Sequence, residues 1–523
     1  MMLQHRRTAA KASDLNHRGK VVAASSSPST SSNGGKRLRG QQKRRKNKYR
    51  SSSSLTTLLV IAMVSFLFIF TAITIVFQHL GRGTSSSHNY SNNVYRDRFL
   101  RNNLQEADGV NNNNDDGVKR REARYQSLYR PKFDQNQLGY DIYNCPATPP
   151  PVYPMAWKTT EVLTDWMPHD VTTIAPNYRE IYQGLCVFDY QSQYDIALNY
   201  RNAEMPFIIR NDPNVMSVAK RWEEDTEYLH KNLGDQERFR TERSPINEFM
   251  WYRLHGQRTP RGYVKPPNDE VGMTYGEFLE LALAKDAAAL QDPELFAKVS
   301  AMKKKRMEII ADKELHDIDL SEENDDDDQL EDESTEEEKL KNWYYFRLTT
   351  SLRVASKGEE FSSEKFVYNE LPFFDPRKRS KSQFYIVDPE EERGINCRFG
   401  MRGVISANHF DMSRNFIMIF GGERRYVLRH PNQCKNMTLF PHGHPSLRHS
   451  EVDWNNPLDW DKHPEFKQTL VNEVVLHAGD ALYLPTAYFH FIVNLSLNYQ
   501  CNARSGTTYE NAKHIQDCGF NMG

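Results

Sequence analysis

An uncharged segment close to the N-terminus constrains the fold of this chain more than any other feature of its sequence. Residues 55–77 contain no Asp, Glu, Lys or Arg and consist mainly of Leu, Ile, Val, Phe, Ala and Thr. At about 1.5 Å per residue, a helix of this length spans the hydrocarbon core of a bilayer, which is roughly 30 Å thick. The segment predicts one transmembrane helix, with the rest of the chain divided between the two sides of a membrane.

The charges that flank this segment predict its orientation. Nine Lys or Arg residues and no acidic residue lie between Lys36 and Arg50. Only two basic residues, Arg82 and Arg96, lie in the twenty residues that follow the segment. The positive-inside rule makes residues 1–54 a basic cytoplasmic tail. It predicts a single-pass type II membrane protein of the endoplasmic reticulum or Golgi, with its long C-terminal part in the lumen. The basic run then acts in membrane topology, and we expect no nucleic-acid partner.

Shifts in composition divide the predicted lumenal part into four regions. Residues 78–135 are rich in Asn, Ser, Asp and Arg, which is typical of a flexible stem. Residues 136–311 contain frequent aromatic and Pro residues and predict the N-terminal part of a folded domain, with a helical insertion over 275–310. Residues 312–341 predict an acidic, disordered insertion. Residues 342–523 remain as the core of the domain.

This last region has the pattern of a mainly β domain. Short apolar or alternating segments are separated by Gly, Pro, Asn and Asp, as in a sandwich or barrel of short strands. The segments that predict strands are Tyr344–Leu348, Phe384–Val387, Gly403–Ser406, Phe416–Phe420, Tyr426–Leu428, Val474–Leu476, Ala481–Leu484 and Phe491–Leu495.

A His-x-Asp pattern and a distant His carry the chemistry of this region. On a strand, His409 and Asp411 point to the same face, because side chains alternate with a period of two. His490 ends the segment Gly479–His490, which predicts a turn, a strand and a loop marked by Pro. Two imidazoles and one carboxylate can bind Fe(II) on one side and leave positions open for a bidentate oxoacid and for O2. The three residues therefore predict an iron site.

Five motifs, in the same order, resemble those of the JmjC or cupin-like iron(II)- and 2-oxoglutarate-dependent hydroxylases. They are most similar to the branch containing the asparaginyl hydroxylase that inhibits hypoxia-inducible factor. The main resemblance covers residues 343–504, and one weaker motif lies upstream. The motifs are Met205–Arg210 with Ala219 and Trp222, His409–Asp411 with Asn415, Gly422–Leu428, Ser450–Asp453 with Asn456 and Pro457, and Gly479–His490.

The resemblance implies a fold, cofactors and site residues. The implied fold is a double-stranded β-helix of the cupin or jelly-roll type, with flanking helices. Fe(II) is the implied metal, and 2-oxoglutarate and O2 are the implied co-substrates. The implied catalytic and metal-binding residues are His409, Asp411 and His490, and those implied to bind the co-substrate are Ser406, Asn415, Arg424, Asn502 and Tyr345.

Three positions depart from the family pattern. Arg424 stands where the family commonly has a Lys; a guanidinium can bind a carboxylate as a bidentate fork, but it is larger than an ammonium. Tyr488 and Arg504 stand where a Trp is common, and these differences change the wall of the pocket rather than the metal ligands. Without the resemblance, Arg424 and Arg425 read as surface charges of a strand. Six further histidines crowd this region, and none is assigned to the metal: His430, His442, His444, His449, His463 and His477.

Cysteines and glycosylation sequons fit a lumenal setting. All six cysteines lie after the predicted membrane helix, so up to three disulfides can form, and their pairing stays open. Cys397 and Cys501 lie in or beside predicted core strands and have a second interpretation as buried thiols. Among the sequons, Asn89 and Asn436 lie in predicted exposed segments, whereas Asn494 lies in a predicted strand and is expected to be unmodified.

Three functional hypotheses follow from these observations. The leading one is a membrane-anchored oxygenase that hydroxylates a protein side chain in the secretory pathway, with a protein or peptide as its partner. The second is a non-catalytic lumenal module that uses the cupin-like scaffold for binding. The third is a glycosyltransferase, which the short tail, single helix and stem would suit. The sequence names neither the substrate nor the oligomeric state.

Overall fold

The computed structural model describes most of the chain from residue 128 onward. Within this part no helix is long and apolar enough to cross a membrane. The predicted tail, the predicted transmembrane helix, the stem up to residue 127 and the acidic insertion up to residue 340 lie outside the described residues. The described residues are 128–171, 178–234, 237–252, 265–291, 341–356, 362–378, 383–441 and 443–520.

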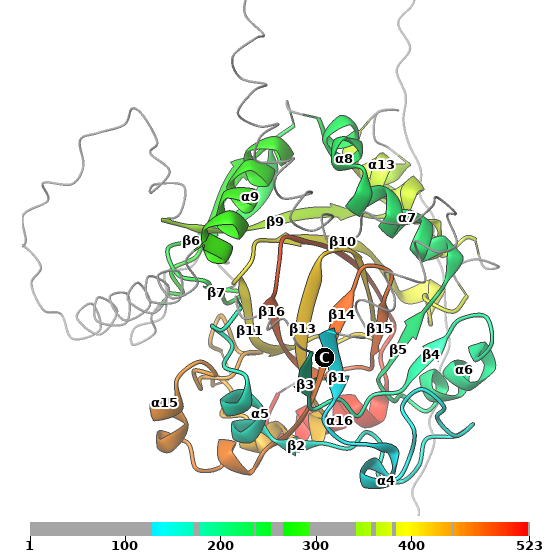
Figure 1. Cartoon of the computed structure of the whole chain (residues 1–523), viewed down its shortest axis with the longest axis vertical. Coiled ribbons are helices and arrows are strands. Elements are labelled where there is room, and N and C mark those ends of the chain that lie inside the picture. Colours follow the sequence, from blue (N-terminus) through cyan, green and yellow to red (C-terminus); the bar gives the residue numbers. More distant parts are fainter. Residues whose placement is uncertain are drawn as a thin grey trace, which may run out of the picture. The chain divides into compact units, whose positions relative to one another are not determined.

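Two β-sheets build the fold and surround a common interior (Figure 1). The larger sheet has the order β4 (Val187–Asp189), β5 (Phe207–Arg210), β15 (Ala481–Leu484), β12 (Asn415–Gly421), β17 (Asn498–Ser505), β10 (Glu392–Gly400), β9 (Trp343–Thr350), β6 (Phe239–Ser244) and β8 (Asp269–Met273). The smaller sheet has the order β2 (Trp157–Lys158), β14 (Leu470–His477), β13 (Glu423–Arg429), β16 (Phe489–Asn494), β11 (Ile405–Phe410) and β7 (Glu248–Phe249). Two short parallel strands, β1 (Tyr129–Pro131) and β3 (Arg179–Ile181), form a separate pair.

Helices cover the sheets from outside. α7 (Pro213–Glu224) packs on β12, while α9 (Tyr275–Gln291) and α13 (Ser363–Glu370) pack on β9. Figure 1 shows these helices gathered on one side of the molecule, next to β9 and β10. The other helical elements are α4 (Gln135–Leu138), α5 (Thr159–Asp165), α6 (Tyr194–Asn202), α8 (Thr226–Leu233), α12 (Leu352–Ala355), η1 (Pro372–Phe374), η2 (Pro389–Glu391), η3 (Pro431–Asn436), α15 (Pro457–Lys462), η4 (Phe466–Gln468) and α16 (Tyr509–Asp517).

The start of α7 shows how the sequence sets one of these helices. Asp212 caps the helix by accepting a hydrogen bond from the backbone N–H of Asn214 at 2.8 Å, and Pro213 occupies the first turn, where its missing N–H is not needed. Apolar residues then recur on one face at helical spacing and are buried. These residues are Val215, Val218, Ala219 and Trp222.

Strands on both sides of the acidic insertion build the same sheets. β5 pairs with β15, β6 pairs with β9, and β7 lies parallel to β11. The predicted mainly β fold with flanking helices is therefore confirmed, and the segment before residue 312 completes both sheets. The membrane anchor stays a prediction.

Some local predictions differ from the structure. Residues 129–131 were placed in the stem, but they pair with β3, so the fold begins before residue 135. The segment Phe384–Val387 forms a turn rather than a strand. Its apolar side chains resemble those of a strand because they are buried: Phe384 and Tyr385 pack on Phe416 with ring centroids 5.6 and 5.2 Å apart. The bounds of β10 and β17 were not predicted, although Cys397 and Cys501 were placed in or beside core strands.

All six cysteines form disulfides. Cys145 pairs with Cys186, Cys397 with Cys501, and Cys434 with Cys518. Cys397 and Cys501 lie directly opposite each other on the antiparallel strands β10 and β17, so the interpretation of these two as buried thiols was wrong.

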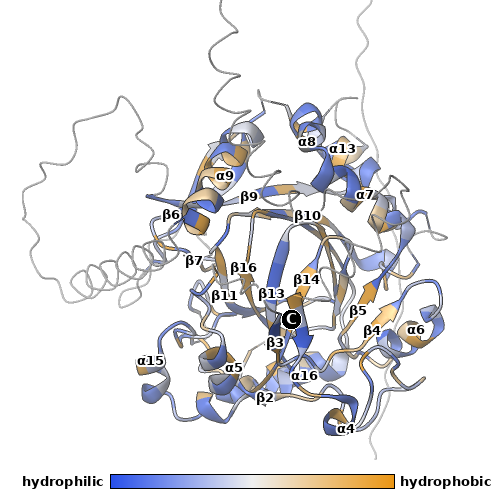
Figure 2. Ribbon diagram, in the orientation of Figure 1, coloured by the Kyte–Doolittle hydropathy of each residue, from blue (hydrophilic) through white to orange (hydrophobic). Residues whose placement is uncertain are grey.

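The strand β13 is unusual because it is both central and polar. Figure 2 shows it largely in blue between more apolar strands. Its seven residues have the sequence ERRYVLR, and all are buried. Arg424 and Arg425, which read as surface charges from the sequence alone, are both fully buried. A buried strand with three arginines must find partners for them, and those partners define the interior.

Candidate metal centre and the polar interior

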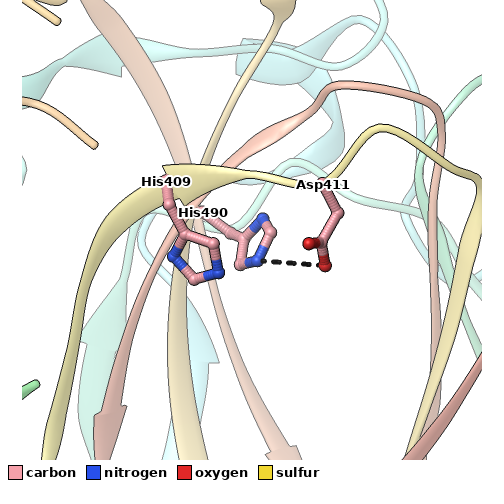
Figure 3. A group of neighbouring side chains, drawn as sticks. All are labelled: His409, Asp411 and His490. Atoms are coloured by element: carbon pink, nitrogen blue, oxygen red, sulfur yellow. Dashed lines mark ion pairs between the residues drawn. The ribbon is translucent and has the colours of Figure 1, made fainter. Parts of the chain in front are cut away.

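The predicted metal ligands meet where β11 and β16 pair. His409 lies opposite His490 in this antiparallel register, and Asp411 follows the last residue of β11. One ligand atom from each of the three side chains lies within 4.8 Å of the others. The Nε2 atom of His490 is 4.0 Å from Oδ2 of Asp411, as Figure 3 shows. The fold thus brings together all three residues that the sequence predicted.

Backbone carbonyls set the tautomer of both histidines. Nδ1 of His409 lies 2.8 Å from the carbonyl oxygen of Ala407, and Nδ1 of His490 lies 3.0 Å from that of Tyr488. A carbonyl oxygen only accepts, so Nδ1 carries the hydrogen in each ring and donates it. Each Nε2 then keeps its lone pair for a metal. Two such nitrogens and one carboxylate fit a divalent transition metal.

The electrostatics of the site favour the same protonation states. Burial, reinforced by His490 and His449, lowers the pKa of His409 well below its usual value, and burial also lowers the pKa of His490. Burial alone would raise the pKa of Asp411, but Arg504 and then the two histidines lower it to about 2. Near neutral pH the imidazoles are therefore neutral and the carboxylate is ionised, which is what metal binding requires.

A stripe of polar side chains on β17 leads from this centre into the interior. Asn498, Gln500, Asn502 and Arg504 alternate with Tyr, Cys and Ala, so these four side chains share one face of the strand. At one end of the stripe, Nη2 of Arg504 lies 2.6 Å from Oδ2 of Asp411. At the other end, Asn498 and Gln500 accept hydrogen bonds from Arg424. The stripe connects the metal ligands with the buried arginine of β13.

The remaining predicted co-substrate residues belong to this same interior. Asn502 donates to Oδ1 of Asn415 at 2.8 Å, and Asn415 donates to Oδ2 of Asp411 at 3.3 Å. Ser406 donates to the hydroxyl of Tyr345 at 3.5 Å. That hydroxyl in turn accepts from Nη1 of Arg424 at 3.2 Å. Through Gln500, which accepts from Arg424 and donates to Asn502, the structure joins the five predicted co-substrate residues and Asp411 into one hydrogen-bonded group. His409 and His490 lie beside Asp411 but make their hydrogen bonds to backbone carbonyls.

Arg424 has only neutral partners in the part of the chain that the structure describes. Besides Asn498, Gln500 and Tyr345, its guanidinium donates to the carbonyl oxygen of Arg398 at 2.8 Å. No carboxylate of the described residues pairs with it, although the side chain is fully buried. Removing a charge from water is unfavourable unless an opposite charge compensates it. An anionic ligand in the interior would supply that compensation.

Arg398 adds to the positive charge of the interior. Burial lowers its pKa to about 10, with the positive charges of Arg504 and Arg424 acting in the same direction, so it still carries a charge at neutral pH. Tyr345 and Asp411 act in the opposite direction. Arg424 and Arg504 therefore add their positive charges to that of Arg398, and the interior suits a ligand with more than one negative charge.

Sequence reasoning missed His449, which lies against a metal ligand. Its ring stacks on that of His409 with centroids 5.2 Å apart, and the two residues form a β-bridge. Its Nε2 accepts the backbone N–H of Trp251 at 3.3 Å, and its Nδ1 donates to the carbonyl oxygen of Ser446 at 3.2 Å. The available signal was its position directly before the Ser450–Asp453 motif.

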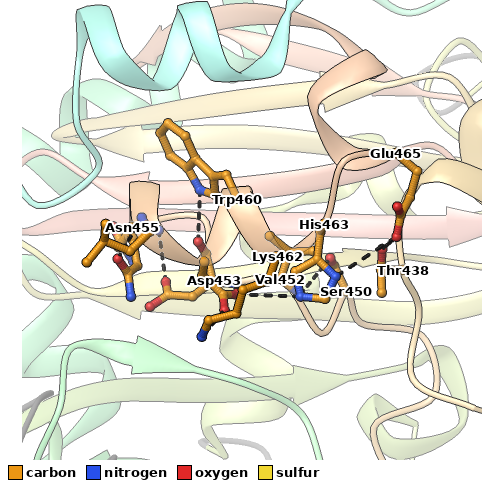
Figure 4. A network of polar contacts seen from close by, with 12 residues as sticks. Thr438, Ser450, Val452, Asp453, Asn455, Trp460, Lys462, His463 and Glu465 are labelled. Atoms are coloured by element: carbon orange, nitrogen blue, oxygen red, sulfur yellow. Dashed lines mark hydrogen bonds and ion pairs between the residues drawn. The ribbon is translucent and has the colours of Figure 1, made fainter.

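The loop that follows His449 is fixed by a network of side-chain hydrogen bonds (Figure 4). Ser450 donates to the carbonyl oxygen of Met437 at 2.7 Å. Further along, Trp460 donates to the carbonyl oxygen of Asp453 at 3.0 Å. These bonds stabilise the loop internally, while the backbone N–H of Ser450 donates to the carbonyl oxygen of Asn408 on β11 at 3.2 Å and so keeps the ring of His449 beside the candidate metal centre.

Comparison with known proteins agrees with this architecture. A family model described as "Cupin-like domain" matches residues 195–505, more than half of the chain. This range includes the weak upstream motif on β5 and α7 as well as the metal centre.

Several relatives carry related names. JmjC domain-containing protein D of Dictyostelium discoideum is 35% identical over 112 residues, which are 21% of this chain and 24% of that protein. Lysine-specific demethylase 8 of Danio rerio is 32% identical over 111 residues, 21% of this chain and 27% of that protein. tRNA wybutosine-synthesizing protein 5 of Mus musculus is 27% identical over 173 residues, 29% of this chain and 53% of that protein.

The chain thus spans between about a quarter and about half of the length of these relatives. Their names do not include the asparaginyl hydroxylase branch, and the nearer kinship with that branch stays a prediction. The family match, the two sheets and the His-Asp-His centre agree with one another: this chain belongs to the cupin-like domain family.

Proposed function

We propose that the chain is an iron(II)- and 2-oxoglutarate-dependent oxygenase that hydroxylates a side chain of a protein substrate. One observation carries this proposal. The interior has a metal-binding group at one end and a fully buried arginine without a carboxylate partner at the other, and a polar stripe joins them. A metal and a dicarboxylate bound together would satisfy both ends at once.

The residues take distinct roles under this proposal. His409, Asp411 and His490 would hold iron(II), which supplies the activation of O2 that no protein side chain can provide. Asn415, whose amide donates to Oδ2 of Asp411, would fix the orientation of this carboxylate. Burial of the whole group would exclude water from the reaction.

The distal carboxylate of the co-substrate would bind at the arginine end. Arg424 would bind it as a charged donor, and the hydroxyls of Ser406 and Tyr345 lie close enough to the guanidinium to add neutral hydrogen bonds. The neighbouring side chains of Asn498 and Gln500 already hold the guanidinium in place, so an arginine can serve where the family commonly has a Lys.

The substrate and the compartment are parts of the same proposal. The name of lysine-specific demethylase 8 refers to a lysine target for that relative, which supports a protein side chain as the substrate class here. Three disulfides support an oxidising compartment, because disulfides persist there and are rare in the cytosol. We propose a type II membrane protein with this domain in the lumen. Asn436, half-buried at the end of η3, is the sequon to test for a glycan, and Asn494 is buried.

Turnover of 2-oxoglutarate tests the proposed chemistry. Purified protein supplied with Fe(II), O2 and 2-oxoglutarate should release succinate and CO2, and His409→Ala should abolish the release. His463→Ala is the matched control, because His463 lies in the loop outside the metal centre and should be without effect. Absence of succinate release from the unmodified protein, across the iron and oxoacid concentrations that support known oxygenases, would exclude the proposal.

The substrate can be sought in the secretory pathway itself. Secreted and membrane proteins from cells with and without the gene should differ by the mass of one oxygen atom at specific side chains. Protease protection of the domain in sealed microsomes tests the proposed topology independently, because a lumenal domain is protected until detergent is added.

A second candidate is a non-catalytic binding module. The close contact between Arg504 and Asp411 favours it, because a cation already neutralises the carboxylate that iron needs. In that case His409→Ala would retain the biological function of the protein, and metal would not bind. Metal binding by the unmodified protein that is lost in His409→Ala would exclude this candidate.

A further inference from the structure

Arg504 makes an unusual contact for a residue beside a metal site. Its Nη2 lies 2.6 Å from Oδ2 of Asp411. That same oxygen faces Nε2 of His490 at 4.0 Å and accepts the amide of Asn415 at 3.3 Å. The guanidinium therefore competes for the oxygen that points toward the histidine ligands.

The contact is also less constrained than those of the neighbouring arginines. Arg424 donates to four acceptors, whereas Arg504 has its ion pair with Asp411, and its Nε is buried with no acceptor among the described residues. The side chain of Arg504 is 32% exposed, compared with 11% for that of Asp411. The guanidinium thus has room to change partners and has one donor available for a new acceptor.

The charges around Asp411 indicate when such an exchange would occur. Arg504 is in contact with Asp411, and the charges of Arg398 and Arg448 also interact with that of Asp411, so the positive charges near this carboxylate already outnumber it. A divalent cation entering alone would add two more positive charges to a buried site, which like charges oppose strongly at low dielectric. A dicarboxylate would remove that opposition and would offer Arg504 a new carboxylate partner.

We propose that Arg504 couples metal binding to dicarboxylate binding. Without the dicarboxylate, the guanidinium holds Asp411 and keeps the affinity for a divalent metal low. With the dicarboxylate bound, the guanidinium moves to a ligand oxygen and releases Asp411 to the metal. This inference rests on the metal site and co-substrate of the proposed function and adds an order of assembly to them. Because coupling is reciprocal, the metal must raise the affinity for the dicarboxylate by the same factor.

Co(II) is a suitable probe because its binding can be followed by calorimetry and by its visible absorption, without turnover. The full chain, purified in detergent, is titrated with Co(II) alone, with 2-oxoglutarate, and with glutarate. Glutarate keeps both carboxylates but lacks the 2-oxo group, so it separates charge from chelation. In the unmodified protein, both dicarboxylates should raise the affinity for Co(II).

Arg504→Gln removes the competing charge and keeps a polar side chain. Co(II) alone should bind this variant about tenfold more tightly, and the gain in affinity that glutarate brings should fall by about the same factor, since the two effects share one cause. Arg504→Lys keeps the charge and should retain most of the coupling. Arg210→Gln is the matched control: Arg210 pairs with Asp480 at 2.9 Å, away from the metal ligands, and its loss should leave Co(II) binding unchanged.

The outcomes separate this inference from the proposed function. If the unmodified protein bound no Co(II) under any condition, the metal site itself would be refuted. If it bound Co(II), but Arg504→Gln bound the metal equally or more weakly, the metal site would stand and the coupling role of Arg504 would be refuted. Coupling to glutarate that persisted undiminished in Arg504→Gln would also overturn it. Near-ultraviolet circular dichroism, compared between Arg504→Gln and Arg504→Lys, identifies a variant that has lost its packing.

Discussion

The two faces of β13 place an arginine side chain in opposite electrostatic environments. Arg424 and Arg425 are neighbours in the sequence, both fully buried, and point to opposite faces because strand side chains alternate. On the outer face, Arg425 forms an ion pair with Glu473, donates to the carbonyl oxygen of Trp166 at 2.7 Å and lies 4.4 Å from the centre of its ring. On the inner face, Arg424 meets only uncharged oxygens.

Under the proposed function, this difference separates a structural arginine from one that would bind the co-substrate. On the outer face the ion pair with Glu473 neutralises the charge of Arg425, so no ligand is needed there. On the inner face, no carboxylate of the described residues neutralises Arg424, and a buried charge of this kind is unfavourable unless an anionic ligand compensates it. Burial as such does not distinguish the two residues; the presence or absence of a carboxylate partner does.

The largest expected effect concerns the outer face. Glu473→Gln leaves Arg425 buried without a counter-charge and also weakens the bond from the backbone N–H of Tyr182 to Glu473, which is 3.0 Å long. Breaking a buried pair by removing one partner destabilises a protein by about 3–5 kcal/mol. Denaturation by urea should show this loss in the free energy of unfolding.

A paired replacement is the control for this effect. Arg425→Met combined with Glu473→Met removes both charges at once and should recover most of the lost stability, because no uncompensated charge remains. If Glu473→Gln lowered the free energy of unfolding by less than about 1 kcal/mol, Glu473 would not be the counter-charge that stabilises buried Arg425.

The next largest effect concerns the inner face and should appear in binding. Arg424→Gln should weaken the affinity for 2-oxoglutarate about a hundredfold, since each hydrogen bond to a charged group contributes about 1.5–3 kcal/mol. Its loss of stability should be smaller than that of Glu473→Gln, because removing an uncompensated charge offsets part of the lost hydrogen bonding. Equilibrium dialysis and urea denaturation measure the two quantities. If Arg424→Gln lost more stability than Glu473→Gln and kept its affinity for 2-oxoglutarate, the assignment of binding to the inner face and of stability to the outer face would be wrong.

The sequence predicted the metal ligands but not the surroundings that make the inner face distinctive. His409 and Asp411 were predicted together because a strand fixes the direction of alternating side chains, and His490 was predicted from the segment Gly479–His490 and the family resemblance. The apolar strands β12 and β15 were found because their residues are dense in Ile, Phe and Leu. The polar strand β17 was missed, since polar residues alternating with Tyr, Cys and Ala do not mark a buried strand unless the interior is known to be polar.

Contacts that depend on pairing between distant strands could not be predicted from the sequence. The disulfide between Cys397 and Cys501 follows from the register of β10 against β17, which no local pattern sets. The contact between Arg504 and Asp411 follows in the same way from the pairing of β12 with β17, which places Arg504 opposite Asn415. Tertiary pairing decided these features, whereas the His-x-Asp pattern and the segment that ends in His490 can be recognised locally in the sequence.

Acidification separates the contribution of the histidines to stability from the contribution of the arginines. Arginines keep their charge at every pH between 5 and 8. Burial, with His490 and Arg448 acting in the same direction, lowers the pKa of His449 to about 3, against about 6.5 in an unfolded chain. Below pH 6.5 the unfolded state therefore takes up protons first, and stability is lost as the pH falls toward the folded value. Between pH 6.5 and pH 5 this one residue should remove about 2 kcal/mol.

The free energy of unfolding of the metal-free protein at pH 7 and pH 5 measures this loss. His449→Phe keeps a ring to stack on His409 but cannot be protonated, so its loss on acidification should be smaller than that of the unmodified protein by about 2 kcal/mol. An equal loss in both proteins would show that His449 is not held neutral in the folded state.

The smallest effect tests whether charge dominates the inner face. Ser406 contributes one neutral and long hydrogen bond, 3.5 Å, to the hydroxyl of Tyr345, which still accepts from Arg424 when Ser406 is removed. Ser406→Ala should therefore weaken 2-oxoglutarate binding only about twofold to fivefold, as expected for a neutral hydrogen bond of about 0.5–1 kcal/mol. Ser406→Thr, which keeps the hydroxyl, should bind like the unmodified protein. If Ser406→Ala weakened 2-oxoglutarate binding as much as Arg424→Gln, hydroxyl contacts rather than the charge of Arg424 would determine the affinity. The missing carboxylate partner would then not explain how Arg424 differs from Arg425.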